Sequence, residues 1–359
     1  MTIIYITGFG KMIFSSKYFT YYIFTALIII IVSYFANQWK KSFESDKEER
    51  ELIQKFLLND TPLYGHNRPK LWIHTTYDIN ARKWKTFSSR NTTDLNQPYI
   101  HLTIKTIINH CGDDFNVCLI DDESFSRLLP SWEIDLSRTP EPMRTRYREL
   151  GILQLIYLYG GLAVPNSFVC LKNMKEFYDT NTSGNKPFVC EKVNQSENLS
   201  IKSQKLFTPD TYIMGANKGD QTVLELLNYL KDKYKSGHFT SENEFLGETS
   251  LLCTQAIQVN KMNLVGGELV GVKTNKKEAI LLENLIEEDY LDLDRNAVGI
   301  YIPMDQVLQR HKYQWFAVLS SDDILNSNMI ISKYLTASIV DTTSEYNKKT
   351  EVKSTVVSI

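Results

Sequence analysis

The sequence predicts an α/β protein with a mainly parallel β-sheet, preceded by one transmembrane helix. Three observations support this fold class. From about residue 69 onward, short runs of β-branched and aromatic residues alternate with longer helical patterns, as in strand–helix–strand units. An amphipathic segment that ends at Tyr159 runs into Gly160-Gly161 and then a short apolar stretch. Closer to the N-terminus, residues 18–36 carry no charge.

Composition excludes some classes of protein. The 359 residues are 43% hydrophobic and 23% charged, which suffices for a substantial core. The net charge of −2 and the absence of a long basic run argue against a nucleic-acid partner. The five cysteines show no CxxC spacing, so buried free thiols are expected rather than a zinc site, although Cys111 and Cys118 are close enough in sequence to be bridged in an oxidising compartment.

The uncharged run over residues 18–36 predicts a single membrane anchor that follows an N-terminal segment, residues 1–17. As a helix it would span about 28 Å, close to the hydrocarbon thickness of a bilayer. No small-residue cleavage site follows it, so an uncleaved anchor is favoured over a signal peptide. Lysine and arginine counts place the body in the cytosol.

Glycosylation acceptor sequences point instead to a secretory-pathway membrane, so the orientation stays open. We expect the acceptor asparagines to lie on surface loops, because they stand in polar, turn-rich stretches. They are Asn91, Asn181, Asn194 and Asn198, with Asn59 a weaker match because Pro62 follows it.

The remaining chain divides into three parts. Residues 37–68 are charged and helix-prone and form a predicted stem. Residues 69–340 hold the folded domain, in which strands are expected near 70–77 and 115–121 with a helix between them. A helix over 146–159 then leads through the Gly-Gly turn into another strand, and a further strand and helix follow from residue 211. Residues 341–359 are polar and aperiodic, which predicts a disordered tail.

The order of these motifs resembles the capsular-polysaccharide-synthesis and DXD-containing sugar transferase families, which are related GT-A glycosyltransferases. The resemblance rests on "KLWIHTTY", "QPYIHLTIKTIINHCGDDFNVCLIDDESFSRLLPSW", "RYRELGILQLIYLYGGLAVPNSFVCLKN" and "YIMGANKGDQTVLELLNYL", and covers roughly residues 70–234. It implies a GT-A-like domain over 69–340 that binds a nucleotide sugar and a glycan or protein acceptor.

The resemblance also implies site residues. It places Trp72 and His74 beside the nucleotide, aligns Pro98 with the start of a helix, and aligns Asp121 and Asp122 with an acidic pair after the next strand. A late phosphate-contacting histidine of related enzymes would be His311, in "RHKYQWF". The implied nucleotide-sugar contacts are Trp72, His74, Arg148, Gly160, Gly161, Asn166, Ser167 and His311.

The chain departs from the family pattern at its most specific element. The pattern has S-D-x-x-R on a helix, then Gly-Gly, then D-x-D or D-A-T. Here Glu149 takes the place of the helix aspartate and Ile152 that of the arginine, with Arg148 one turn away. Residues 165–167, Pro-Asn-Ser, stand where the acidic motif is expected. Such carboxylates usually hold Mn²⁺ or Mg²⁺ against the donor's diphosphate, so no metal site is expected at Pro165, Asn166 or Ser167.

Three hypotheses follow. The chain transfers a sugar without that metal, using basic residues such as Arg144, Arg146 and Arg148. Alternatively, other acids hold Mn²⁺ or Mg²⁺: either Asp121 and Asp122, or Glu244 and Glu248, which are four residues apart. In the third, the domain is a catalytically inactive pseudo-glycosyltransferase that acts as a binding or scaffold module, and the Asp121-Asp122 pair only caps a helix. The candidate catalytic residues are Asp121, Asp122, Glu149, Glu244 and Glu248.

Overall fold

The computed structural model describes residues 21, 23–37, 68–75, 97–130, 132–194, 209–236, 242–287 and 290–339, without side-chain surroundings at 235–236 and 242–248. The chain forms two compact units, Met1–Leu52 and Ile53–Ile359. The predicted tail and nearly all of the predicted stem lie outside the described residues.

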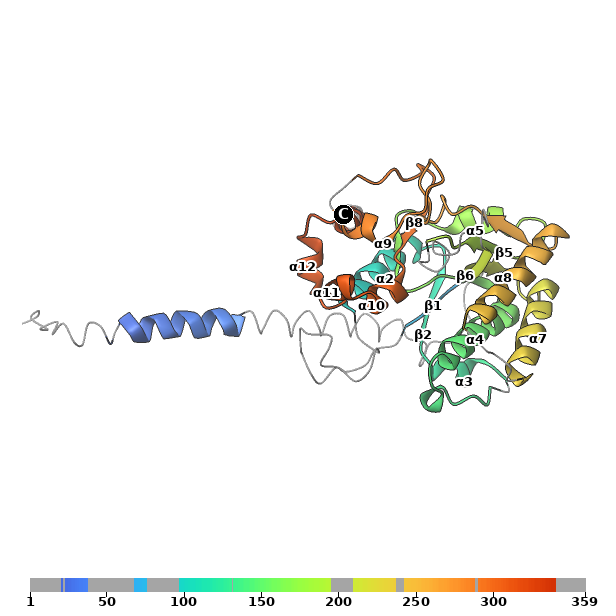
Figure 1. Ribbon diagram of the computed structural model, residues 1–359, viewed down its shortest axis with the longest axis horizontal. Coiled ribbons are helices and arrows are strands. Elements are labelled where there is room, and N and C mark those ends of the chain that lie inside the picture. The colour runs from blue at the N-terminus through green and yellow to red at the C-terminus, as the bar shows by residue number, and fades with distance from the viewer. Residues whose placement is uncertain are drawn as a thin grey trace, which may run out of the picture. The chain divides into compact units, whose positions relative to one another are not determined.

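The described part of the first unit is a helix with exposed apolar side chains (Figure 1). It comprises residue 21 and residues 23–37. The predicted transmembrane helix over residues 18–36 is wrong, because no helix among the described residues is both long and apolar enough to cross a membrane.

The second unit is built on a six-stranded sheet with the order β2-β1-β3-β6-β5-β7. Strands β1, β2 and β3 pair in parallel, as do β5 and β7, whereas β6 runs antiparallel to both β3 and β5. The predicted α/β class with a mainly parallel sheet is therefore confirmed. The strands are β1 (Lys70–His74), β2 (Asn116–Ile120), β3 (Gly161–Ala163), β5 (Phe188–Glu191), β6 (Pro209–Ala216) and β7 (Asn263–Val265).

Helices cover both faces of the sheet. Trp72 of β1 packs in one core cluster with α4 and α7, so the alternation along a strand directs its neighbours Leu71 and Ile73 to the opposite face. In Figure 1, α4, α7 and α8 lie together on one side of this unit. The helices are α2 (Pro98–Cys111), α3 (Ser124–Leu128), α4 (Met143–Tyr159), α5 (Lys175–Asn181), α7 (Gln221–Ser236) and α8 (Glu242–Gln258).

The C-terminal part of the unit packs beside α2. A two-stranded ribbon joins β4 (Phe168–Cys170) to β8 (Gly299–Tyr301), and α2 contacts both β4 and α12. Residues 330–339 are helical. The remaining short elements are α9 (Leu282–Ile286), α10 (Met304–Gln309), a 3-10 turn (His311–Tyr313), α11 (Gln314–Ala317) and α12 (Ser321–Leu325).

The Gly-Gly turn that the sequence singles out joins α4 to β3. Gly160 and Gly161 have φ angles of 71° and 109°, which favour glycine. A Cβ atom on Gly161 would lie 2.2 Å from the carbonyl oxygen of Lys70, so only glycine lets β3 pair with β1 here. The buried Trp72 indole donates a hydrogen bond to the Gly160 carbonyl at 2.9 Å and so holds the turn against β1.

Two expectations about single residues have different outcomes. The five cysteines are buried free thiols, as predicted, with the sulfurs of Cys111 and Cys170 3.8 Å apart. The expectation that acceptor asparagines lie on surface loops is wrong for Asn194, which is 0% exposed because the chain turns into the interior after β5. Asn181 is partly buried at the end of α5, and Asn91 and Asn198 lie outside the described residues.

Candidate functional site

The polar residues of interest gather at the carboxyl ends of the parallel strands. From β1 the chain crosses through α2 to β2 on one side, whereas β3 pairs with β1 on the other side. Ligands of open α/β sheets bind at such a reversal, beyond the carboxyl ends of the strands. At this edge, the Thr75 amide donates to the Ile120 carbonyl at 2.8 Å and extends the β1–β2 pairing.

His74, Asp122 and Arg148 meet at this edge. Nε2 of His74 lies 2.9 Å from the Asp122 carboxylate, and Arg148 donates to both Asp122 oxygens at 2.8 and 2.7 Å. The His74 ring also stacks on Phe125, with centroids 5.6 Å apart. Although burial opposes ionisation, hydrogen bonds from His74 and Arg148 hold the pKa of Asp122 well below its usual range. The structure thus joins three sequence-predicted residues in one ion-paired cluster.

Asp121 has a different role from its neighbour. Its carboxylate accepts hydrogen bonds from the Ser124 amide at 2.8 Å and the Ser124 hydroxyl at 2.6 Å. These contacts tie the carboxyl end of β2 to the first residue of α3. The N-cap residue of α3 is Glu123, which makes no side-chain capping hydrogen bond, so Asp121 stands two residues before the cap position.

Residues 165–167 stand directly after β3, at the carboxyl end where they are expected. The amide of Val164 still pairs with the Trp72 carbonyl, and the Phe168 amide donates to the Pro165 carbonyl at 3.1 Å to close a turn. Thr103 of α2 donates to the Asn166 carbonyl, and the Ser167 side chain is 1% exposed.

This segment does not fit a divalent cation. Pro165 carries no side-chain ligand, the Ser167 hydroxyl is enclosed, and a hard cation prefers carboxylate oxygens. At the neighbouring strand ends, the Asp121 and Asp122 carboxylates are engaged by Ser124, His74 and Arg148. Among the described residues, no group of three or more His, Cys, Asp or Glu side chains is arranged to hold a metal ion.

The three arginines expected to act together make different contacts along α4. Arg144 donates to the Thr139 carbonyl at 2.9 Å, and Arg148 belongs to the Asp122 cluster. Arg144 and Arg148 also lie 4.0 and 3.8 Å from the same oxygen of Glu141. Arg146 is buried, with its guanidinium 3.7 Å from the Met143 sulfur.

Glu149 faces the β6 side of the sheet. Thr211 donates a hydrogen bond to its carboxylate. Glu149 as a whole residue is half-buried. Burial, with a further contribution from the charge of Asp210, raises the pKa of Glu149 to about 7. Glu149 is therefore a carboxyl group that changes its protonation state near neutral pH.

Sequence analysis missed the residues that surround Glu149. Because β6 is antiparallel, its first residues lie at the same edge as the end of β5, and Cys190 pairs with Asp210. Lys192 lies 3.7 Å from Asp210 and over the rings of Tyr212 and Tyr301, at 5.3 and 5.8 Å. The only sequence signal for this group is a charged residue directly after an apolar strand.

Other predicted residues lie elsewhere. Trp72 is buried in the core beneath the Gly-Gly turn, and His311 is exposed on the 3-10 turn after α10, with its ring 3.3 Å from the Gln314 amide oxygen. Glu244 and Glu248 lie in α8, as helical spacing requires, but their side-chain surroundings are outside what the structure describes. Their metal-binding role stays a prediction.

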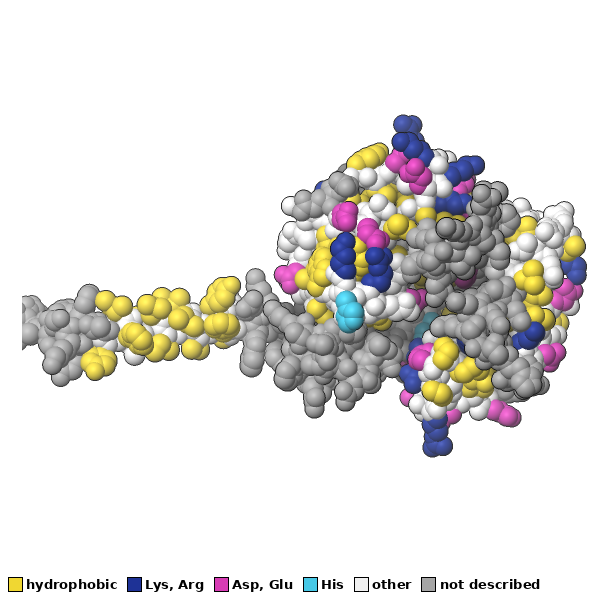
Figure 2. Space-filling view, viewed as in Figure 1, with side chains coloured by type: hydrophobic (Ala, Val, Ile, Leu, Met, Phe, Trp, Pro, Cys, Tyr) yellow, Lys and Arg dark blue, Asp and Glu magenta, His cyan; other side chains and the backbone are white. Residues whose placement is uncertain are grey.

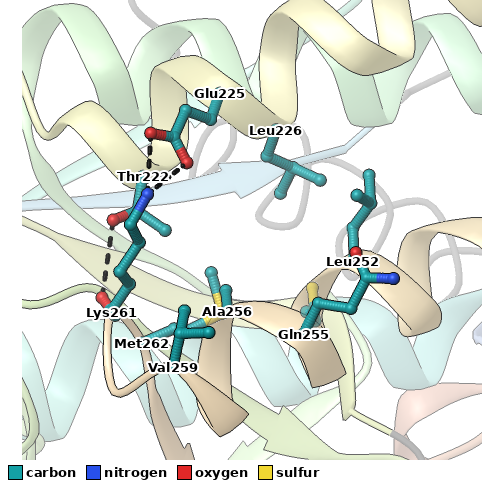
Figure 3. Close-up of a pocket in the computed structure, with 10 residues that line it drawn as sticks. Thr222, Glu225, Leu226, Leu252, Gln255, Ala256, Val259, Lys261 and Met262 are labelled. Atoms are coloured by element: carbon teal, nitrogen blue, oxygen red, sulfur yellow. Dashed lines mark hydrogen bonds and ion pairs between the residues drawn. The ribbon is translucent and has the colours of Figure 1, made fainter.

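A surface cavity of about 190 Å³ lies between α7 and α8 (Figure 3). The Lys261 ammonium contacts both oxygens of Glu225 at 3.0 Å beside it. Thr222 follows the end of antiparallel β6 and Lys261 precedes the start of β7, so this side of the cavity lies at the amino edge of the sheet. The cavity is thus separate from the candidate site.

Comparisons with known proteins find structural neighbours but no match in sequence. No family model matches the chain, and no curated protein matches it in sequence. A solved structure described as "PaToxG Glycosyltransferase" aligns with 82% of this chain and 94% of that chain, at 12% identity and a TM-score of 0.32. The chain therefore has a glycosyltransferase among its structural neighbours, at a similarity that carries neither the capsular-polysaccharide family nor the DXD motif over to it.

Proposed function

We propose that this chain is a glycosyltransferase-like protein that takes a nucleotide sugar as donor and a glycan or protein as acceptor. One observation carries the proposal: three side chains that are far apart in sequence, His74, Asp122 and Arg148, meet at the carboxyl ends of β1 and β2. Next to them, between β1 and β3, the chain order of the strands reverses. That is where α/β sheets place nucleotide ligands. The family resemblance assigns His74 and Arg148 to the donor site and aligns Asp122 with an acidic pair.

The cluster supports donor binding through preorganisation. Arg148 and Asp122 fix the orientation of the His74 ring, and Phe125 stacks against it, so the imidazole does not need to be ordered when a ligand arrives. The guanidinium and imidazole supply hydrogen-bond donors for phosphate oxygens. No step is assigned to a divalent cation, because residues 165–167 do not fit one.

A second candidate function is a binding module without turnover. The observation that favours it is the carboxylate-free turn at residues 165–167, in which Ser167 is buried and where the family pattern places its acidic motif. Under this reading the chain binds a saccharide or nucleotide ligand but does not transfer the sugar.

The test is calorimetric titration of the full-length protein with UDP-glucose, UDP-N-acetylglucosamine and GDP-mannose, in Mn²⁺ and in EDTA. We expect at least one donor to bind equally in both, and His74→Ala to weaken it about tenfold, the size of one lost charge-assisted hydrogen bond. His110→Ala, at the opposite end of α2, serves as the control. No binding of any donor would refute the proposal, whereas binding without release of nucleoside diphosphate to any acceptor would favour the second function.

A further inference from the structure

Two of the buried cysteines lie side by side where α2 packs on β4. Cys111 is the last residue of α2 and Cys170 is the last residue of β4, and each is 0% exposed. Their sulfurs are 3.8 Å apart, although the two residues are 59 positions apart in the sequence. At this distance the two thiols are in direct contact, and either can donate a hydrogen bond to the other.

The backbone of Cys170 is held on both sides by hydrogen bonds. Its amide donates to the Thr106 hydroxyl of α2 at 2.9 Å, and its carbonyl accepts a hydrogen bond from the Ser338 hydroxyl. Nε2 of His110, the neighbour of Cys111, lies 2.9 Å from the same Ser338 hydroxyl. Because these contacts set the spacing between α2 and β4, the packing of the two elements determines how close the sulfurs lie.

A covalent bond between the two sulfurs requires a small movement. An S–S bond is about 2.05 Å long, so the sulfurs have to approach each other from 3.8 Å. Rotation about the Cα–Cβ bond moves the sulfur of each cysteine while its backbone stays in place. The hydrogen bonds of Cys170 to Thr106 and Ser338 use backbone atoms only, so they persist during this rotation.

The structure favours a different pair from the one that proximity in sequence suggests. Cys118, seven positions after Cys111, lies in β2 and belongs to the core cluster of Trp72 with α4 and α7. Its sulfur is 3.3 Å from the carbonyl oxygen of Asn116. Cys111 contacts Cys170 instead. The expected bridge between Cys111 and Cys118 is therefore replaced by one between α2 and β4.

We propose that Cys111 and Cys170 form a disulfide bond when the protein folds in an oxidising compartment, and that this bond clamps α2 to β4. With a small disulfide such as oxidised glutathione as oxidant, one cysteine thiolate attacks the S–S bond, forms a mixed disulfide and releases one reduced glutathione. The second cysteine thiolate attacks the protein sulfur of the mixed disulfide and releases the other glutathione. The two cysteines lose two electrons and two protons, which the two glutathione molecules carry away.

Burial sets the time of this reaction. Both cysteines are enclosed once α2 and β4 have packed, so the oxidant reaches them while the chain is folding. In a reducing compartment the same two residues stay thiols and the fold encloses them unbonded. The pair is thus a modification site whose state records the compartment in which the chain folded.

The clamp acts next to the candidate site. Strand β4 begins directly after the turn at residues 165–167, and Thr103 of α2 donates to the Asn166 carbonyl in that turn. Thr103, Thr106 and Cys111 of α2 thus all contact the segment 166–170. A disulfide adds a constraint on the unfolded chain that hydrogen bonds do not supply. The inference does not depend on the proposed function.

The experiment identifies the bonded pair directly. The full-length protein is synthesised in a cell-free system with an oxidising or a reducing glutathione buffer, and the remaining thiols are alkylated in denaturant. Digestion with a protease that cleaves before aspartate separates Cys111 from Cys118, because Asp113 lies between them. Mass spectrometry without reduction then maps the cross-link. Cys170→Ala is the test variant, and Cys118→Ala, which also removes one buried thiol, is the matched control.

In the oxidising buffer we expect a cross-linked peptide pair that contains Cys111 and Cys170, with Cys118, Cys190 and Cys253 alkylated. The Tm of the oxidised protein should exceed that of the reduced protein by about 5–10 °C, the range expected for bridging a long loop. Cys118→Ala should keep this difference, whereas Cys170→Ala should abolish it.

Five alkylated cysteines after synthesis in the oxidising buffer, or a bond between any other pair, would refute the proposal. A bond between Cys111 and Cys170 that lowers the Tm would show that the fold does not accommodate it, and would overturn the clamp. If Cys170→Ala does not fold, the peptide map and the Tm difference of the wild type and of Cys118→Ala decide.

Discussion

The two ends of the sheet's carboxyl edge differ in how their polar groups are satisfied. At the β1–β2 end, Asp122 is held by His74 and Arg148 in a cluster whose charges and hydrogen bonds are matched. At the β5–β6 end, burial and the nearby charge of Asp210 raise the pKa of Glu149, and the Asn194 amide has no hydrogen-bond partner among the described residues.

The polar groups of the Asp122 cluster thus have partners within the protein, whereas the Asn194 amide has none among the described residues. A matched ion pair is already ordered, so little free energy is spent on ordering it when a ligand binds. An unsatisfied buried group loses free energy in the empty protein and regains it when a complementary ligand is present. Figure 2 shows side chains of both charges scattered over the described surface of this unit.

The largest expected effect comes from breaking the matched end. Arg148→Met should destabilise the protein by about 3 kcal/mol, since it leaves the partly buried Asp122 carboxylate without its guanidinium. Urea unfolding at pH 7 measures the change. Arg127→Met removes an exposed i,i+4 pair with Glu123 and should cost no more than about 0.5 kcal/mol. Equal effects of the two substitutions would show that the Asp122 cluster is not a distinct unit.

The next effect is a difference in pH dependence. The pKa of Glu149 is raised from 4.5 to about 7 in the folded state, so the folded protein binds more protons than the unfolded chain between these values. Stability from this group is present below pH 4.5 and is lost as the pH rises through 7. Asp122 behaves in the opposite way: its depressed pKa gives stability above pH 3.8 that is lost as the pH falls further.

Glu149→Gln tests this contrast. It keeps an oxygen acceptor for Thr211 and removes the titrating proton, so stability at pH 8 should rise by roughly 2 kcal/mol and the decline between pH 4.5 and 7 should disappear. Chemical unfolding across this range gives both quantities. Glu225→Gln, on an exposed part of α7, should leave the profile unchanged. A wild-type profile that is flat from pH 4.5 to 7 would refute the assignment.

The smallest effect sharpens the description of the matched end. Ser124→Ala removes the buried hydroxyl that donates to Asp121 and should cost about 1 kcal/mol, the usual value of one hydrogen bond. Ser126→Ala, two residues later and exposed, should change stability by no more than about 0.3 kcal/mol. If both substitutions were neutral, the Ser124 hydroxyl would not hold Asp121 in place, and Asp121 would again be open to another role.

Sequence predicts the fold well where the structural cause is local. The strand at residues 70–74, the helix 98–111 and the Gly-Gly turn all follow from periodicity and from the backbone freedom of glycine. The transmembrane helix was predicted from the length of the uncharged run over residues 18–36, and no helix among the described residues is both long and apolar enough to cross a membrane.

The site is predicted less completely. His74, Asp122 and Arg148 were each identified, because each belongs to a recognisable motif beside a strand or helix. The sequence groups Arg148 with Arg144 and Arg146, but in the structure Arg148 forms an ion pair with Asp122. This tertiary contact joins residues 26 positions apart, which no local pattern predicts. Lys192 was missed as a site residue because the antiparallel insertion of β6 brings it to the edge, and no local pattern encodes that insertion.

The burial of Asn194 also bears on how the chain matures. Asn194-Gln-Ser is an acceptor sequence in form, but an oligosaccharide cannot be attached to a side chain enclosed in a folded protein. Modification would have to precede folding, and the attached glycan would then prevent the chain after β5 from turning inward. In a glycosylating compartment, enzymatic modification at this asparagine and completion of the fold therefore exclude each other, and the faster of the two determines whether a molecule matures.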